Sequence, residues 1–246
     1  MEEISKNQID KLGQRLKEGY PTAADLTMLN EYGESFGKAY EEFIEIIRNK
    51  LNLVPTERLR KSNQSIIDKL KRISIQLSQI QDIVGCRLVV PDISAQNELT
   101  NLLKNTFSSV TIKDRRIQPS HGYRAIHIIV KHFGKLIEIQ IRTELQHTWA
   151  QLSEKWADEF DPTIKYGGGD KEKQTNLNSL SQAIKMIEES EEELSNLPVN
   201  AISNLLQNMP QNILISDTTN PYTVIKKILI HTIRGIMGYS KNTHRE

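Results

Sequence analysis

The sequence predicts an α+β protein, in which a mixed β-sheet is flanked by helices and further helices extend from both ends. Apolar residues recur at every third or fourth position over residues 4–52, which is the period of amphipathic helices. Short alternating or continuous apolar stretches follow, with a helical stretch among them. Two of these predicted strands are adjacent in sequence and would form a hairpin, which favours a mixed sheet over a purely parallel one.

The N-terminal region, residues 1–52, is predicted to form two helices. Gly19-Tyr20-Pro21 interrupts the periodic pattern. Thr22 is a candidate N-cap for the second helix, because its hydroxyl can accept a hydrogen bond from a free backbone N–H. After Pro55 comes a basic segment, in which we expect a helix beginning at Ser65 with an apolar inner side made of Ile66, Ile67, Leu70 and Ile73.

The predicted sheet begins with a strand over residues 83–90, followed by a helix over 94–107 and a short strand over 109–112. Two strands with polar faces come next, joined by a tight turn at residues 132–135. We expect the first to place Tyr123 and His127 on one face and Arg124 on the other.

Strict alternation in the second of these strands places Ile137, Ile139 and Ile141 on one face. Glu138, Gln140 and Arg142 then share the opposite face. A row of carboxylate, amide and guanidinium groups needs polar partners, and a phosphate-rich ligand with a metal ion would supply them.

The C-terminal part is predicted to be helical. A helix over residues 144–160 precedes the break at Gly167-Gly168-Gly169, and long helices are expected over 171–196 and 222–237. We therefore divide the chain into three parts: N-terminal helices over 1–52, a core over 53–165 and a helical extension over 171–246.

Composition narrows the class of protein. The 246 residues carry a formal net charge of +1, but six Lys or Arg lie within residues 57–72 and five Glu within 188–193, so a basic and an acidic patch are expected. The single cysteine, Cys86, excludes an internal disulfide and a multi-thiolate zinc site, and its apolar surroundings favour a core position. No apolar stretch approaches the ~20 residues of a membrane span, and no signal peptide opens the chain, so we expect a cytoplasmic protein.

Nucleotide binding by the two commonest loops is excluded, because the chain lacks both G-x-x-x-x-G-K-[ST] and G-x-G-x-x-G. Two acids remain as candidate metal ligands. Asp82 precedes the strand at 83–90, and Glu138 lies on the polar face of a later strand. Carboxylates from separate strands can hold Mg²⁺ against a triphosphate. The alternatives are a turn residue for Asp82 and a solvated sheet face for Glu138.

Cations near these acids are candidate phosphate ligands. Arg87 interrupts an otherwise apolar strand, and a buried arginine needs an anion, either an internal acid or a ligand phosphate. Lys69 and Arg72 are three apart on a predicted helix and share a face. The same basic segment, which is otherwise explained as a solvated surface, contains Arg58, Arg60, Lys61, Lys69 and Arg72.

Three further residues are candidates for contacts with a second substrate. Tyr123 follows Gly122 and is positioned either to stack on a purine or to join the core. His127 would contact a ligand phosphate or satisfy the core. His147 follows Gln146 at the start of a helix, where these two side chains either orient substrate or cap and pack.

Four motifs in order give a resemblance to a known family: RKSNQSIIDKLKR, DIVGCRLVV, KDRRIQPSHGYRAIHIIV and EIQIRTELQHTWA. Together they resemble the synthetase domain of the RelA/SpoT family over roughly residues 40–160. The resemblance implies a nucleotidyltransferase-like mixed sheet. It also implies transfer of the β,γ-pyrophosphate of ATP to a ribose 3′-hydroxyl, with Mg²⁺.

The resemblance also implies roles for individual residues. Asp82 and Glu138 would be the catalytic acids and metal ligands, with Glu138 completing the metal site or acting as base. The acceptor would be bound by Tyr123, His127, Gln140, Arg142 and His147. The ATP phosphates would be held by Arg60, Lys61, Lys69, Arg72 and Arg87, with Arg58 and Arg60 as alternatives for the first position of the family's R-x-K-S motif.

Two departures bear on the acceptor. The loop before Gly122 reads QPSH, where alarmone-making members commonly offer a lysine and asparagine, and the helix TELQHTWAQLSEK is closer to the toxic small alarmone synthetases. Such toxins modify the 3′-terminal adenosine of tRNA and are checked by an antitoxin. The alternatives are a (p)ppGpp synthetase that uses GDP or GTP, and a catalytically inactive nucleotide-binding regulatory module. The basic tail, residues 217–246, would pack on the domain, contact tRNA or bind a partner, and the oligomeric state stays open.

Overall fold

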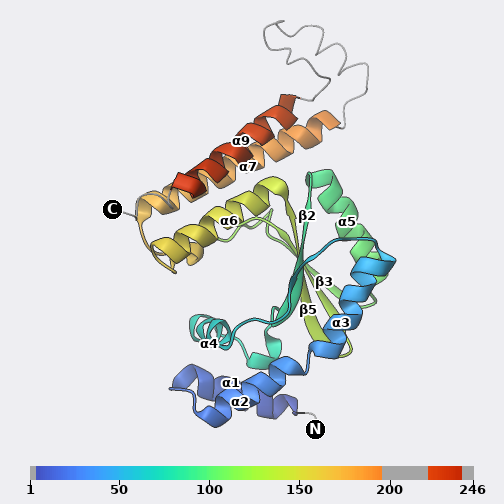
Figure 1. The fold of residues 1–246 in the computed structure, drawn as a ribbon, viewed down its shortest axis with the longest axis vertical. Helices are drawn as coiled ribbons and strands as arrows, with labels where there is room; N and C mark the ends of the chain where they lie inside the picture. Colours follow the sequence, from blue (N-terminus) through green and yellow to red (C-terminus); the bar gives the residue numbers. More distant parts are fainter. Residues whose placement is uncertain (1–3, 196–220, 240–246) are drawn as a thin grey trace, which may run out of the picture. The chain divides into compact units, whose positions relative to one another are not determined.

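The computed structural model describes residues 4–195 and 221–239, which form two compact units (Figure 1). The described residues of the first unit come from Met1–Leu88, Leu102–Lys113 and His127–Ile141. Those of the second come from Val89–Asn101, Asp114–Ile126 and Arg142–Glu246. Each unit therefore combines three separate stretches of sequence. The three-part linear division stays a prediction.

Two capped helices open the first unit. Ser5 and Thr22 each accept a hydrogen bond from the third helical N–H, and these caps begin α1 (Lys6–Glu18) and α2 (Ala23–Glu34). The predicted break before Thr22 and its role as N-cap are confirmed. The prediction of one continuous helix from Thr22 to residue 52 is wrong. Helix α2 ends where the Ser35 hydroxyl donates to the Tyr32 carbonyl. The chain then continues as α3 (Gly37–Glu45) and a π-helical turn, η1 (Ile46–Lys50).

Helix α4 (Asn63–Arg72) carries the basic segment. Its N-cap is Ser62, whose hydroxyl accepts from the backbone N–H of Ser65, so the predicted start at Ser65 is wrong by two residues. Ile66, Ile67 and Leu70 are buried as expected, whereas Ile73 beyond the helix end is exposed. Helix α1 packs against α2, α4 and the short turn η2 (Leu77–Gln79).

The five-stranded sheet has the order β1-β2-β5-β4-β3. Its strands are β1 (Thr56–Arg58), β2 (Val84–Val90), β3 (Val110–Asp114), β4 (Ile126–His132) and β5 (Lys135–Thr143), and α5 (Ile93–Thr106) follows β2. The predicted hairpin is present, since the two-residue turn Phe133-Gly134 links adjacent β4 and β5. The α+β fold with a sheet flanked by helices is thus confirmed, while β1, which pairs antiparallel with β2, was not predicted.

One strand boundary changes the placement of a candidate residue. Strand β4 begins at Ile126, so Tyr123 and Arg124 precede it and the expectation that Tyr123 shares a strand face with His127 is wrong. His121 and Gly122 both have positive φ, and Ser120 and Tyr123 exchange backbone hydrogen bonds around them. This closed turn uses the backbone groups of Tyr123 locally.

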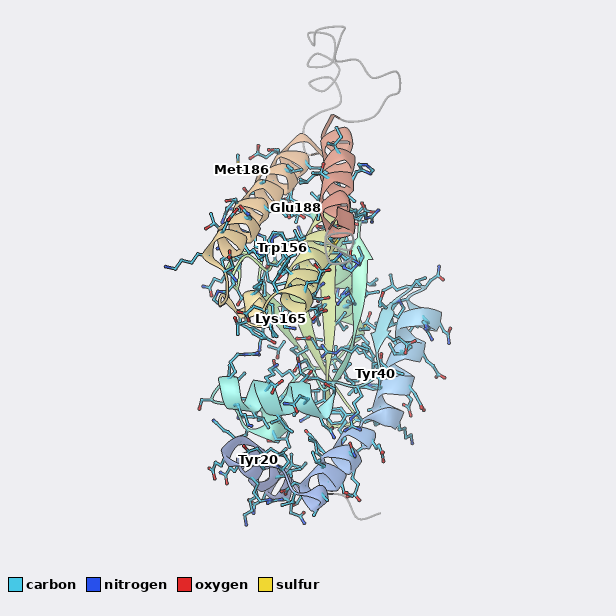
Figure 2. The ribbon with its side chains drawn as sticks, turned by 60° about the vertical axis from the view of Figure 1, so that its left-hand side comes forward. Tyr20, Tyr40, Trp156, Lys165, Met186 and Glu188 are labelled. Carbon is cyan, nitrogen blue, oxygen red and sulfur yellow. The ribbon has the colours of Figure 1, made fainter. Side chains whose placement is uncertain are left out.

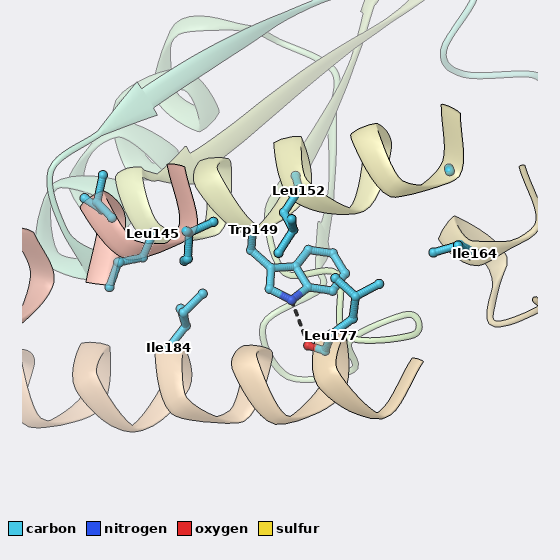
Figure 3. Packing of buried hydrophobic residues seen from close by; sticks show 10 residues of the cluster. Leu145, Trp149, Leu152, Ile164, Leu177 and Ile184 are labelled. Atoms are coloured by element: carbon cyan, nitrogen blue, oxygen red, sulfur yellow. Dashed lines mark hydrogen bonds between the residues drawn. The ribbon is translucent and has the colours of Figure 1, made fainter. Parts of the chain in front are cut away.

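The second unit is built on α6 (Glu144–Glu159), η3 (Ile164–Tyr166), α7 (Lys171–Ser195) and α9 (Pro221–Tyr239). Helix α6 packs on both α7 and α9, and α7 and α9 lie side by side (Figure 1). Their shared core contains Trp149, whose indole N–H donates to the Leu177 carbonyl at 2.8 Å (Figure 3). Trp149 is 3% exposed and is therefore a core residue of this unit.

The C-terminal helix contributes to this core. Ile230 and Ile233 of α9 are buried in the cluster, and the Lys226 ammonium lies near the Glu191 carboxylate at 3.8 Å. Of the readings considered for the basic tail, packing on the domain therefore holds for α9. Residues 217–220 and 240–246 of the tail lie outside the described residues. None of the helices described here has the length and apolar character needed to cross a membrane.

Candidate functional site

A cavity of about 220 Å³ opens on the β1, β2 and β5 side of the sheet, within the first unit. Five of the predicted site residues line it: Arg58, Asp82, Arg87, Glu138 and Gln140. Sequence reasoning did not assign its other lining residues, Thr56, Glu57, Val84, Gly85 and Cys86. Thr56 and Glu57 lie on β1, a three-residue strand too short to give a periodic signal, and Val84, Gly85 and Cys86 lie on β2.

Close contact between two strands forms the floor of this cavity. A Cβ added to Gly85 would lie 2.3 Å from the backbone oxygen of Glu138, so only glycine allows β2 and β5 to approach so closely here. The Tyr40 hydroxyl of α3 donates to the Gly85 carbonyl at 2.9 Å (Tyr40 is labelled in Figure 2). Helix α3 thereby fixes the strand on which Arg87 lies.

Asp82 forms two ion pairs from the edge of this cavity. The ammonium groups of Lys61 and Lys69 each lie 2.7 Å from one of its oxygens, and all three side chains are largely buried. Burial opposes ionisation of Asp82, but the two ammonium charges outweigh it and hold the pKa of Asp82 well below its usual range. Asp82 is therefore ionised near neutral pH, and its carboxylate holds the two lysines together.

Glu138 is held by a histidine and an amide. His127 Nδ1 lies 2.9 Å from one carboxylate oxygen, and Gln140 Nε2 donates to the other at 2.8 Å. Burial raises the pKa of Glu138, but the hydrogen bond and charge of His127 outweigh it, so the net pKa is lowered. Because an ionised carboxylate only accepts, His127 Nδ1 must carry the proton. Glu138 is thus an oriented, ionised carboxylate.

The donors fit a magnesium ion that binds together with phosphates. The charge of Asp82 acts on Glu138, and both carboxylates line one cavity. Each carboxylate oxygen retains a further acceptor position beyond the hydrogen bond it already accepts. Within residues 4–195 and 221–239, no group of three or more His, Cys, Asp or Glu could form a metal site. Mg²⁺ is commonly held by one or two carboxylates plus substrate phosphates, which is the set available here.

The structure separates the two arginines that compete for one motif position. Arg58 lines the cavity, whereas the Arg60 guanidinium donates to the carbonyl of Leu29 and to Asn30 and Asn63. Arg60 is therefore used to attach α2 to the start of α4. Arg72, at the end of α4, is exposed and does not line the cavity.

The cysteine in the cavity wall is unreactive. Cys86 is 4% exposed, and burial raises the pKa of its thiol to about 12. The thiol therefore stays protonated near neutral pH and serves as a small apolar side chain. This agrees with the expectation of a core position.

The remaining candidates for the acceptor lie in the second unit. The Arg142 guanidinium donates to the Tyr123 hydroxyl, with nitrogen–oxygen distances of 3.1 and 3.3 Å, and its carbon lies 5.0 Å from the Tyr123 ring centre. Tyr123 also packs partly against the core cluster around Trp149. His147 is half-buried in the first turn of α6. Gln146 forms the capping box of that helix with Thr143, which agrees with capping, one of the two roles expected for it.

Residues 58–159 match the family model described as the region found in RelA/SpoT proteins. This part of the chain is a RelA/SpoT region. The resemblance noted from the four motifs is thereby confirmed for residues 58–159.

Relatives of the RelA/SpoT region include uncharacterised proteins. One from Mycobacterium tuberculosis is 31% identical over 170 residues, which cover 66% of this chain. The match spans 62% of that relative, less than two thirds of its length.

Solved structures share the fold. Small alarmone synthetase 1 of Bacillus subtilis, solved with its product pppGpp, is 26% identical with a TM-score of 0.51, over 66% of this chain and 95% of that one. Small alarmone synthetase 2 of the same organism has 24% identity and a TM-score of 0.52, over 70% and 98%. A GTP pyrophosphokinase family protein of Streptococcus pneumoniae has 21% identity and a TM-score of 0.51, over 77% and 99%.

Proposed function

We propose that this protein is an ATP-dependent pyrophosphokinase that transfers the β,γ-pyrophosphate of ATP to a ribose 3′-hydroxyl. One observation carries the proposal: two ionised carboxylates, Asp82 and Glu138, share a cavity with the cations Arg58 and Arg87. Phosphoryl-type transfer needs charge neutralisation and positioning more than covalent help, and this cavity supplies both signs of charge. The RelA/SpoT region supports the same reaction class.

The reaction assigns a task to each group. The acceptor 3′-oxygen attacks the β-phosphorus, the bond from that phosphorus to the α–β bridging oxygen breaks, and AMP leaves. Glu138 takes the proton of the 3′-hydroxyl, because it is ionised and oriented by His127 and Gln140. Arg58 and Arg87 bind phosphate oxygens. Bound Mg²⁺ would neutralise developing charge on the phosphates, with Asp82 and Glu138 as its protein ligands.

Lys61 and Lys69 take part through Asp82. Their ammonium groups are held at 2.7 Å from its carboxylate, so both cations stay near the cavity edge. ATP phosphates offer competing oxygens for these ammonium groups. With Asp82 as a ligand of Mg²⁺, Lys61 and Lys69 would be available to donate part of their hydrogen bonds to the phosphates.

For the acceptor, we propose the 3′-terminal adenosine of tRNA. The support is the loop Gln118–His121, whose four side chains are all exposed and lack the lysine and asparagine of alarmone-making members. The chain would then be a growth-arresting toxin, controlled by an antitoxin that is either a partner protein or a fused segment.

A second acceptor is favoured by a separate observation. The small alarmone synthetase of B. subtilis that shares the fold was solved with pppGpp as its product. GDP or GTP is accordingly the alternative acceptor, with the same chemistry at Glu138.

The test is a parallel transfer assay. Purified full-length protein is incubated with Mg²⁺ and γ-labelled ATP, with deacylated tRNA, GDP and GTP in separate reactions. Label on tRNA supports the toxin, and label on a guanosine nucleotide supports the alarmone synthetase. ATP binding without label on any acceptor would contradict pyrophosphate transfer and favour a nucleotide-binding regulatory module.

A further inference from the structure

Helix α7 lies beyond the RelA/SpoT region at residues 58–159, yet its buried face reaches two segments that carry candidate acceptor residues. Ser181 and Glu188 on this face are 2% and 5% exposed. They are seven residues apart, which is about two helical turns or about 10 Å along the axis. One rigid helix can therefore fix the spacing of both segments. Figure 2 shows where Glu188 lies on α7.

The first segment is the turn that holds Tyr123. The Ser181 hydroxyl donates to the carbonyl of Gly122 at 2.6 Å and accepts from Arg124 Nε at 3.0 Å. It thus binds the residues on both sides of Tyr123. Gly122 has a φ of +85°, and a Cβ on it would lie 2.7 Å from the Trp149 ring, so this backbone is pressed against α6.

The second segment follows Arg142. The Glu188 carboxylate accepts hydrogen bonds from the Thr143 hydroxyl and, at 3.1 Å, from Gln146 Nε2. These two residues form the capping box of α6, so Glu188 binds both side chains at the start of that helix. The orientation of α6 relative to α7 is also set by the Trp149–Leu177 hydrogen bond (Figure 3).

The two segments meet through their candidate acceptor residues. The Arg142 guanidinium donates to the Tyr123 hydroxyl, and Arg142 is 3% exposed. The position of the Tyr123 ring therefore depends on its own turn, held by Ser181, and on the start of α6, held by Glu188.

We propose that α7 is part of the acceptor site, with Ser181 and Glu188 as positioning residues that set the geometry of the Tyr123–Arg142 pair. This inference rests on the proposed function, in which Tyr123 and Arg142 bind the acceptor nucleotide. Ser181 and Glu188 contact the segments that carry this pair and would act on the acceptor through it. Loss of either therefore weakens acceptor use selectively, because the phosphate-binding cavity of the first unit contains no residue of α7.

The test compares steady-state kinetics of full-length Ser181→Ala and Glu188→Gln with wild type. Glu189→Gln is the control for loss of a neighbouring negative charge, because this carboxylate is exposed and forms an ion pair with Lys185 of the same helix at 3.4 Å. We expect the KM for the acceptor to rise about tenfold in each positioning variant, as loss of one buried hydrogen bond allows. The KM for ATP should change less than about twofold, and the control should match wild type.

A second measurement tests whether Ser181 holds the turn around Tyr123, and it does not depend on enzymatic activity. Amide hydrogen exchange over residues 120–126 should increase in Ser181→Ala and stay unchanged in Glu189→Gln. A fall in kcat with both KM values unchanged, or an equal rise of both, would show a purely structural role and overturn the inference while leaving the proposed function intact. A wild-type chain that binds ATP but transfers nothing to tRNA, GDP or GTP would overturn the proposed function and this inference with it.

Discussion

Replacing Asp82 by asparagine tests the ion-pair cluster at the cavity edge without changing side-chain shape. Asp82 accepts from Lys61 and Lys69 at 2.7 Å, and the Lys61 side chain is only 12% exposed. An amide oxygen can still accept from one ammonium, so the variant loses one hydrogen bond and leaves two largely buried cations, Lys61 and Lys69, without their compensating charge. We expect a loss of about 2–3 kcal/mol in the free energy of unfolding near neutral pH.

The pH dependence of this loss has a defined sign. The pKa of Asp82 is lowered in the folded protein, against a usual value of 3.8. Its contribution to stability is therefore complete above the unfolded pKa and is lost as the pH falls through the lower folded pKa. The difference between wild type and Asp82→Asn should be constant from about pH 7 to about pH 5 and shrink below about pH 4.

Urea unfolding at several pH values measures this difference. Asp68→Asn is the matched control, because Asp68 is exposed on α4 and accepts a hydrogen bond from Gln64 of the same helix. The control should change stability by less than about 0.5 kcal/mol. An Asp82→Asn loss no larger than that of the control, or one that grows as the pH falls below 4, would refute the ion-pair assignment.

Three further predictions concern activity. Arg58→Ala should raise the KM for ATP about tenfold or more, because it removes a cation from the cavity. Arg60→Ala should lower thermal stability and leave the KM for ATP unchanged, because Arg60 bonds to Asn30. Equal effects of the two variants on the KM for ATP would contradict the assignment of Arg58 as the phosphate ligand. His127→Ala removes the group that lowers the pKa of Glu138, so the acidic limb of the pH profile of kcat/KM should move to higher pH. If that limb does not move, Glu138 is not the base that titrates in this profile. Glu138→Gln should lower kcat at least about a hundredfold while an ATP analogue still binds by calorimetry, and retained turnover would remove this carboxylate from the mechanism.

Local signals accounted for much of the fold. The cap at Thr22, the hairpin turn after His132 and the alternation that buries Ile137, Ile139 and Ile141 all depend on neighbours within a few residues. Such features can be predicted because capping and pleat geometry are set locally.

The start of α4, strand β1 and the start of β4 depended on choices between local alternatives and on contacts remote in sequence, which the sequence did not reveal. Ser62 and Ser65 are equally good caps by residue type, and the structure uses the first and places the second at the third helical position. Strand β1 exists only because residues 56–58 pair with β2, a contact remote in sequence. Tyr123 was expected on a strand, but two residues with positive φ place it in a closed turn.

The candidate site shows the same division. The acids and cations of the cavity were proposed from residue type and alternation, and four of them, Arg58, Asp82, Arg87 and Glu138, do line one cavity. Their partners could not be predicted, because the bonds from Arg60 to Asn30 and from Lys69 to Asp82 span 30 and 13 residues. Glu188 was expected in a surface acidic patch, yet it is buried at the start of α6, 45 residues from Thr143.

The central claim is that two phosphates move together, and position-specific labels test it most directly. ATP labelled at the β-phosphate and ATP labelled at the γ-phosphate are offered separately with the acceptor, and the nucleotide product is identified. We predict that both labels reach the acceptor in equal amounts, that AMP is released, and that Glu138→Gln transfers neither label. Transfer of the γ-label alone with release of ADP, or equal transfer by Glu138→Gln, would contradict the account.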